Sequence, residues 1–392
     1  MTFATLRHTL FTVHLWVGLT LGVLLAVLGL SGSLLVYDEA ISDFLAPPPH
    51  AVTAGTPLPL SMLAGIARDA AASQGVEGGQ LQFILPERKT DALVVRFGGL
   101  SPMGNVPGAG GGERRRAEGD KRPARPRQLQ VYLDPVSGEV LGARTFALPP
   151  ILTFAHQLHG NFLMSRETGR PIVGWLGVAM CLLGLSGLVL WWPKRGQWKY
   201  AFKVRRSATG LRFHRELHAA TGIWIFIIFM AVSFSGVVIA WPQTLGLNGP
   251  GTGQRMPMVE AMDGKRLGAT EAVIAATTAV PDIKPRSITI PARPDQPISV
   301  NYRSHDAVNA AVLIDPYSGK VLMVRDTSER FLAWMRPVHD GTLGFVWRFL
   351  VFLSGLVPAL FIVTGLIMWW KKRQRHVPMT AMTEDLAEEE PA

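Results

Sequence analysis

Four long apolar runs constrain this fold more than any other feature of the sequence. Each run is at least 22 residues long, and three of them contain no charged side chain. A helix of about 20 apolar residues is long enough to cross a bilayer, and several such runs are rare in soluble proteins. The sequence therefore predicts a membrane α-helical protein surrounded by a lipid bilayer. The expected transmembrane helices are residues 11–37, 171–192, 219–241 and 349–370.

The distribution of basic residues orients these helices. The stretch 193–215 holds eight Lys and Arg residues and no acid, and a further basic cluster begins at Lys371. Short cytoplasmic loops are enriched in Lys and Arg, so both termini are expected in the cytoplasm. The net charge of +10 then reflects topology, and nucleic acid is not an expected partner because no recognition fold accompanies the charge. The expected cytoplasmic segments are 1–10, 193–218 and 371–392, and the external ones are 38–170 and 242–348.

The two halves of the chain repeat each other. The run LSGLVLWWPKR from Leu185 matches VTGLIMWWKKR from Val363, and VYLDPVSGEVLGAR from Val131 matches VLIDPYSGKVLMVR from Val312. Each half reads as helix, external domain, helix in the same orientation, which implies a pseudo-two-fold axis along the membrane normal. The segment 98–127 has no counterpart, is rich in Gly, Pro and Arg, and is expected to be a mobile loop.

Each external segment has a helical pattern followed by strands, which predicts two small α+β periplasmic domains. Asp134 and Asp315 open matching Asp-Pro-x-Ser-Gly runs, and a tight turn between strands is favoured for both over metal binding. The expected helices are 60–72 and 270–279. The expected strands are 82–86, 92–97 and 128–133 in the first half, and 287–291, 298–302 and 311–314 in the second.

Four histidines form two repeat-related pairs. We call His14 and His218, at the cytoplasmic ends of the first and third runs, the inner pair. We call His159 and His339, just before the second and fourth runs, the outer pair. A two-fold axis would bring the members of a pair to the same depth on opposite sides of the bundle. That geometry suits two axial ligands on one haem iron.

Glycines accompany the inner pair at matching positions. One glycine follows each of these histidines by four residues and another by 18, and both spacings return to the histidine face at 3.6 residues per turn. Such faces would leave room for a flat porphyrin, although close helix packing is an alternative explanation. The glycines are Gly18 and Gly32 in the first half, and Gly222 and Gly236 in the second.

His156 complicates the outer pair because it lies three residues before His159, on the same face of a helix. The match to His339 favours His159 as the ligand, and His156 remains the alternative. Cys181 is the only cysteine, which excludes an intrachain disulfide, an Fe–S cluster and covalent c-type haem.

These features resemble the PepSY-associated transmembrane helix family over nearly the whole chain. The most specific parts are the LHGNFLM segment around His159, the DPxSGxVL runs and the TGLxxWWKKR ending. Many members of the family are linked to bacterial iron acquisition, and some are similar to inner-membrane haem proteins that reduce ferric siderophores of the ferrioxamine type. The resemblance implies PepSY-like external domains, two non-covalent haem b groups and a place in the bacterial inner membrane.

The expected function is transfer of electrons across the bilayer to a periplasmic ferric siderophore, which releases Fe(II). The only glycine-dense run, 108–112, lies in the expected loop and does not follow a strand, so no nicotinamide site is indicated. The donor is then a quinol or a cytoplasmic reductase. Three alternatives remain: a haem carrier for another periplasmic acceptor, a siderophore transporter, and a haem-free binding module.

Overall fold

The computed structural model describes residues 3–51, 53–88, 90–100, 127–145, 147–241, 257–303, 309–325 and 331–374. The expected loop at 98–127 lies almost entirely outside these residues. The chain divides into two compact units, which we call the helical unit and the sheet unit. The helical unit comprises Met1–Ala40, Pro150–Asn248 and Trp334–Ala392, and the sheet unit comprises Ile41–Pro149 and Gly249–Ala333.

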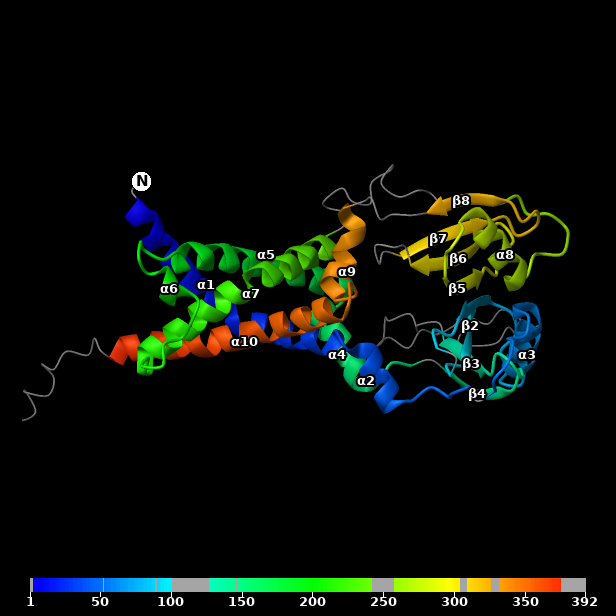
Figure 1. Cartoon of the computed structure of the whole chain (residues 1–392), viewed down its shortest axis with the longest axis horizontal. Coiled ribbons are helices and arrows are strands. Elements are labelled where there is room, and N and C mark those ends of the chain that lie inside the picture. Colours follow the sequence, from blue (N-terminus) through cyan, green and yellow to red (C-terminus); the bar gives the residue numbers. More distant parts are fainter. Residues whose placement is uncertain are drawn as a thin grey trace, which may run out of the picture. The chain divides into compact units, whose positions relative to one another are not determined.

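Membrane-length helices build the helical unit (Figure 1). Among the described residues, four helices are long and apolar enough to cross a membrane, which confirms the expectation from the apolar runs. Each helix begins before its apolar run, and the last one also ends after it, because a helix satisfies its own backbone hydrogen bonds whether its side chains are apolar or charged. The helices are α1 (Phe3–Leu35), α5 (Arg166–Trp191), α7 (Gly210–Ala240) and α10 (Phe345–Gln374).

The bundle joins the two repeats through close helix crossings. α1 of the first half packs against α10 of the second, and α5 packs against α7. At the first crossing, a Cβ on Gly355 would come within 2.6 Å of the Gly29 carbonyl oxygen. At the second, a Cβ on Gly177 would lie 2.8 Å from Val237 Cγ2. Small residues therefore let these backbones approach, as is common between membrane helices.

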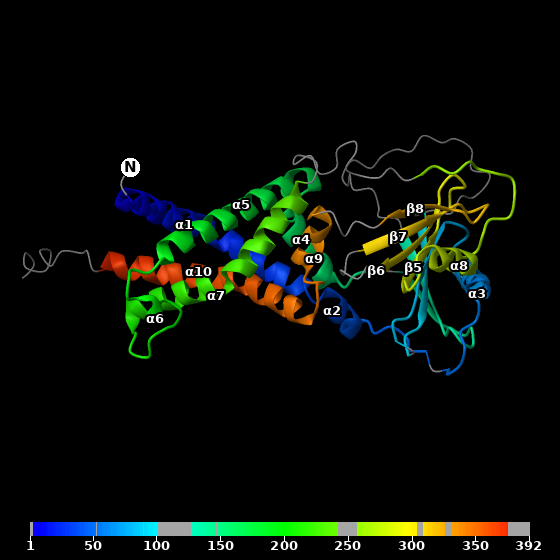
Figure 2. The same ribbon diagram turned by 45° about the horizontal axis from the view of Figure 1, so that its top comes forward.

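Short helices complete the helical unit. α4 (Pro150–Asn161) and α9 (Met335–Asp340) lie at one end of the bundle, and α6 (Trp198–Ala201) lies at the other (Figure 2). α2 (Asp38–Leu45) follows α1, and the 3-10 helix Phe331–Trp334 precedes α9; each crosses a boundary between the helical unit and the sheet unit. The sequence boundaries assigned residues 150–170 to the first external domain, whereas α4 clusters with the membrane-length helices.

The two segments between the membrane-length helices of each half form a single antiparallel sheet. Among the described residues the strand order is β4-β3-β2-β1-β5-β6-β7-β8, so β1 of the first half pairs with β5 of the second. The strands of the first half are β1 (Gln80–Ile84), β2 (Leu93–Leu100), β3 (Arg127–Leu133) and β4 (Val140–Thr145). Those of the second are β5 (Pro285–Ile290), β6 (Ile298–Arg303), β7 (Asn309–Ile314) and β8 (Val321–Arg325).

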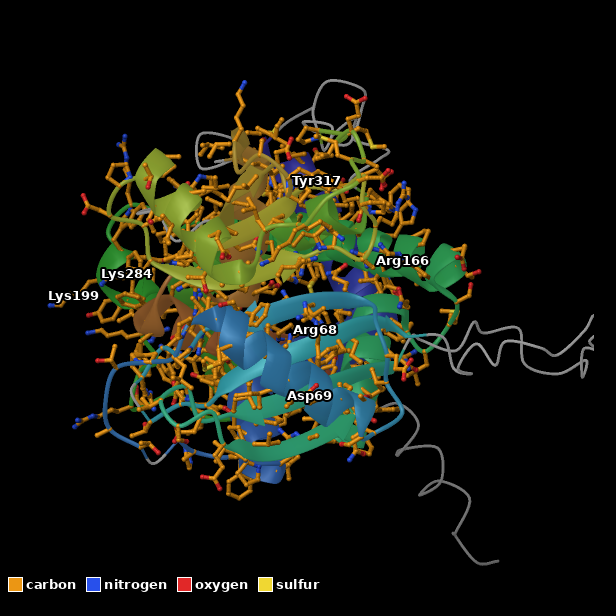
Figure 3. All side chains as sticks on the ribbon, turned by 90° about the vertical axis from the view of Figure 1, so that its right-hand side faces the viewer. Arg68, Asp69, Arg166, Lys199, Lys284 and Tyr317 are labelled. Carbon is orange, nitrogen blue, oxygen red and sulfur yellow. The ribbon has the colours of Figure 1, made fainter. Side chains whose placement is uncertain are left out.

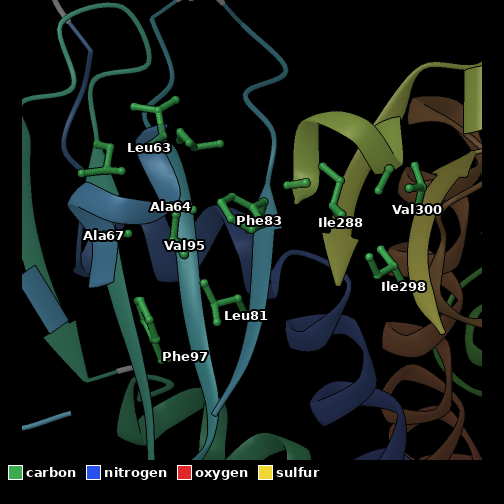
Figure 4. Close-up of a cluster of buried hydrophobic side chains, with 14 of the residues drawn as sticks. Leu63, Ala64, Ala67, Leu81, Phe83, Val95, Phe97, Ile288, Ile298 and Val300 are labelled. Atoms are coloured by element: carbon green, nitrogen blue, oxygen red, sulfur yellow. The ribbon is translucent and has the colours of Figure 1, made fainter. Parts of the chain in front are cut away.

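The junction of the halves follows the repeat. Phe83 lies opposite Ile288, and each of them also faces an equivalent valine, Val95 or Val300, on its other side. Equivalent residues therefore meet across the junction, as a two-fold axis requires. Phe83 and Ile288 are fully buried, and Figure 4 shows them on neighbouring strands of the core.

Helices α3 (Leu60–Ala72) and α8 (Ala269–Ala279) cover the apolar face of the sheet. α3 buries Leu63, Ala64 and Ala67 against the strands (Figure 4). Its next two residues, Arg68 and Asp69, are exposed on the opposite side of the helix (Figure 3). This division between faces is the pattern of an amphipathic helix on a sheet.

Asp134 and Asp315 form the expected turns. Asp134 Oδ1 accepts hydrogen bonds from the backbone N–H groups of Val136 and Ser137, at 2.9 and 3.1 Å. Asp315 Oδ1 accepts the equivalent pair at 2.8 and 3.1 Å. Each turn leads into a fourth strand, β4 or β8, that the sequence interpretation did not include.

Candidate functional site

The inner pair lies between two membrane-length helices. α1 carries His14 and α7 carries His218, and their ring centres are 6.3 Å apart with an angle of 71° between the planes. Both side chains are half-buried. The two helices belong to different halves of the chain, so the site is complete only when the halves assemble.

Hydroxyl groups hold the inner histidines. His14 Nδ1 lies 2.9 Å from Ser186 Oγ, and His218 Nδ1 lies 2.8 Å from Thr364 Oγ1. Each hydroxyl donates its own proton to a backbone carbonyl one turn earlier in its helix. It must therefore accept from the imidazole, which puts the ring proton on Nδ1 and leaves the Nε2 lone pair available for a metal.

The outer pair comes from the short helices. His159 lies on α4 and His339 on α9, and their ring centres are 5.9 Å apart at an angle of 43°. His159 Nδ1 donates to the Leu28 carbonyl and His339 Nδ1 to the Val232 carbonyl, each at 2.9 Å. A carbonyl can only accept, so the tautomer is again fixed with Nε2 free.

Burial keeps the outer histidines neutral. Loss of solvent and the nearby His339 lower the pKa of His159 to about 4. Burial likewise lowers the pKa of His339, although its bond to the Val232 carbonyl opposes the shift. Neutral imidazole is the form that binds a metal.

His156 lies apart from this pair. Its Nε2 is 3.4 Å from Asp38 Oδ2, and its side chain is 42% exposed. The structure therefore brings His159 to His339 and leaves His156 with a carboxylate partner.

The glycines differ between the two ends. A Cβ on Gly32 would lie 2.7 Å from His159 Cε1, and one on Gly236 would lie 2.9 Å from His339 Cε1. At Gly32 and Gly236, the space that the sequence analysis assigned to a porphyrin is therefore occupied by the outer imidazole rings. A Cβ on Gly18 would meet nothing within 4 Å, and one on Gly222 would only touch Phe361 at 3.6 Å.

A cavity of about 1160 Å³ surrounds the inner pair. Gly18 and Gly222 line it, and Phe361 stacks on His218 with ring centres 4.4 Å apart. Drug-sized ligands occupy pockets of about 300–1,000 Å³, so this cavity is large enough for a macrocycle. Other apolar lining residues include Leu15, Leu19, Met180, Leu183, Phe226 and Phe229.

Both pairs have the spacing of two ligands on one metal. An imidazole nitrogen lies about 1 Å from its ring centre and bonds a metal at about 2 Å, so opposed imidazoles hold ring centres about 6 Å apart. The observed 6.3 and 5.9 Å agree with this separation. Within the described ranges, no group of three or more His, Cys, Asp or Glu side chains could hold a metal ion. The spacing of each pair, at 6.3 and 5.9 Å, is thus compatible with two imidazole ligands on one metal.

The sequence interpretation missed Ser186 and Thr364. Both occupy the second position of the matched runs that begin at Leu185 and Val363, so the repeat itself contained the signal. The role of their hydroxyl groups becomes visible only in the structure, where they lie beside the histidines of α1 and α7.

Comparison with family models places this chain among known sequences. The family model described as the PepSY-associated TM region matches residues 11–372. No curated protein matches the chain.

Proposed function

The chain belongs to the PepSY-associated transmembrane family, and from this premise and its histidine pairs we propose a di-haem reductase that delivers electrons across the bacterial inner membrane to a periplasmic ferric siderophore. The observation that carries the proposal is the repetition of one ligand geometry at two depths of one bundle. Each pair has a spacing at which both imidazoles would hold one haem iron, and each Nδ1 is engaged by an acceptor.

The depth of the two pairs suits a transmembrane path. Leu28, which accepts the bond from His159, lies 14 residues after His14 on the same helix. At 1.5 Å per residue the two pairs are about 21 Å apart along α1, a large part of a hydrocarbon core of about 30 Å. The positive-inside rule places the inner pair towards the cytoplasm and both termini on that side.

The protein residues have defined tasks in this proposal. Bound haem b supplies a one-electron couple at each pair. The imidazoles of both pairs provide Nε2 ligands, and the acceptors at Nδ1 hold the rings in place and make them stronger donors. Apolar side chains around the inner pair exclude water.

The substrate chemistry follows from the metal. Siderophores hold Fe(III) through hard oxygen ligands, and Fe(II) is softer and more weakly held by them. Addition of one electron at the outer pair would therefore release the metal. The donor at the inner pair would be a quinol or a cytoplasmic reductase.

The first test is haem content. The purified protein from haem-replete cells should contain about two haems of b type by pyridine haemochrome assay, with six-coordinate reduced spectra. A reproducible ratio near zero would remove the cofactor and with it the proposal.

The second test separates the two ends. The His14→Ala and His339→Ala proteins should each retain about one haem. Each substitution should abolish turnover driven from the cytoplasmic side. After reduction with dithionite and removal of the excess, the His14→Ala protein should still be oxidised rapidly by a ferric siderophore, whereas the His339→Ala protein should react slowly. Equal rates for His339→Ala and wild type would refute the outer site. A di-haem protein that leaves the ferric chelate unreduced would instead be a carrier for another acceptor.

A further inference from the structure

The mouth of the cavity at the inner pair is strongly basic. Its lining includes the side chains of Arg7, Arg212, Arg215 and Lys372, from the ends of α1, α7 and α10. We call these four residues the basic rim. Among the described residues, no Asp or Glu belongs to the cavity lining, so the rim brings positive charge to a largely apolar space.

The nearest acid does not neutralise the rim. Glu216 forms ion pairs with both Arg205 and Arg212, and Arg205 also donates its backbone N–H to this carboxylate at 2.9 Å. Arg205 lies outside the cavity lining and by itself balances the charge of Glu216.

Two rim residues are available for an anion. Arg215 is exposed, and within the described part of the chain it forms no ion pair. Lys372 is also exposed, and its ammonium group lies 5.6 Å from the centre of the Phe11 ring. Arg7 is more committed, because its Nη2 donates to the Leu190 carbonyl at 2.8 Å.

The cavity therefore combines three kinds of surface: a pair of metal ligands in its depth, apolar walls, and a basic rim without acids. A ligand that matches all three has a metal centre, a flat apolar body and carboxylates on one edge. A neutral quinol would make no use of the rim, because it carries no charge to pair with Arg215 or Lys372.

Resting on the proposed function, we infer that the basic rim binds the two propionate carboxylates of the haem held by the inner pair. The propionate edge then faces the basic end of the bundle, and the apolar edge points towards its middle. Charge-assisted hydrogen bonds from Arg and Lys to carboxylate are stronger than neutral ones, so the rim fixes the orientation of the group as well as its affinity.

The test compares haem with its dimethyl ester, in which both carboxylates are masked. The full chain, produced in haem-deficient cells, is loaded with either compound, and release to apomyoglobin is followed optically. Each hydrogen bond to a charged group that is lost should speed release about tenfold to a hundredfold. The ester should therefore leave the inner site at least tenfold faster than haem, and the phase from the outer site serves as an internal reference.

Variants then identify the residues responsible. Arg215→Gln with Lys372→Gln should speed the release of haem from the inner site and remove most of the difference between haem and ester. The matched control is Lys199→Gln with Arg206→Gln, which removes two exposed bases between α5 and α7 that do not line the cavity; it should behave as wild type.

The outcomes separate the two proposals. A chain that retains neither compound contradicts the proposed function itself. A chain that retains both with equal release rates contradicts only the role of the rim. Should the double variant fold poorly, the comparison of haem and ester on the wild-type chain alone decides the matter.

Discussion

The inner and outer histidine pairs share a spacing but are held by different kinds of acceptor. The inner imidazoles bond to side-chain hydroxyls, those of Ser186 and Thr364. The outer imidazoles bond to the main-chain carbonyls of Leu28 and Val232. A hydroxyl can be deleted by one substitution, whereas a helix carbonyl is present whatever side chain the residue carries. A side-chain substitution can therefore remove a hydroxyl acceptor of the inner pair, but it cannot remove a carbonyl acceptor of the outer pair.

The two ends also differ in space. The inner pair borders a cavity of about 1160 Å³, whereas the outer imidazoles pack directly onto Gly32 and Gly236. The same glycine-after-histidine pattern therefore has two roles in one molecule: open space beside the inner histidines at Gly18 and Gly222, and contact with an outer histidine at the other two positions.

Alanine substitution of these glycines should show the largest difference between the ends. Gly32→Ala forces the His159 ring to move, because the new Cβ would lie 2.7 Å from its Cε1. We expect loss of the outer haem, from about two haems per chain to about one by haemochrome assay. Gly18→Ala is the comparison variant at the inner end, since its Cβ meets no protein atom within 4 Å, and it should leave the outer haem in place. Loss of the outer haem from Gly18→Ala would contradict the assigned roles.

Removal of the hydroxyl acceptors should weaken only the inner site. In Ser186→Ala and Thr364→Val the inner imidazoles lose their hydroxyl partner at Nδ1, although His14 keeps its bond to the Leu183 backbone. Outer-shell substitutions of this kind typically cost 10–100-fold in affinity. Haem release from the inner site should accelerate by a similar factor, with the outer phase unchanged.

The comparison variants for that experiment are Ser31→Ala and Ser235→Ala. These hydroxyls lie 3.4 and 3.3 Å from the outer Nδ1 atoms, but the carbonyl bonds at 2.9 Å remain in place. Their effect on release should stay below about tenfold, because long contacts are weak hydrogen bonds. Outer-site release that accelerates as much as the inner site does in Ser186→Ala would overturn the distinction between the two acceptors.

The smallest effect is expected at His156. Its hydrogen bond lowers the pKa of the Asp38 carboxyl below the ordinary aspartate value. The contact therefore stabilises the folded protein at pH values above the ordinary aspartate pKa, and this stabilisation is lost as the pH falls through the lowered pKa. Because both side chains are about 40% exposed, His156→Ala should cost only about 0–1 kcal/mol in the free energy of unfolding at pH 7.

Two measurements check this prediction. Both haems should remain in His156→Ala, and the difference from wild type in thermal unfolding should shrink below the aspartate titration range. A variant that lost one haem would make His156 an outer ligand in place of His159.

The sequence predicted the membrane helices and the pairing of equivalent histidines because both follow from local patterns. Apolar length identifies a membrane helix, and the repeat places His14 with His218 without any tertiary information. The role of Gly32 could not be predicted in this way, since it depends on α4 folding back onto α1. The choice between His156 and His159 likewise depends on how α4 is rotated about its own axis. The helical spacing of the two residues does not determine that rotation.

The joined sheet was also beyond the sequence pattern. Alternation in β1 and β5 indicates strands with one buried face, but it does not say which edges pair. The sequence pattern is therefore equally consistent with two separate domains and with one continuous sheet. The fourth strands, β4 and β8, follow the Asp-Pro-x-Ser-Gly turns directly, and the sequence interpretation ended at those turns.

The pairing of β1 with β5 sets an order of events during synthesis. Ile84 and Pro285 are about 200 residues apart, so at 5–20 residues per second the ribosome needs roughly 10–40 s to supply the partner strand. Until then Phe83 lies on an open strand edge, which is a template for unwanted association. Two further membrane helices, α5 and α7, must also insert within this interval. The nascent first half therefore needs protection from other chains until its own second half arrives.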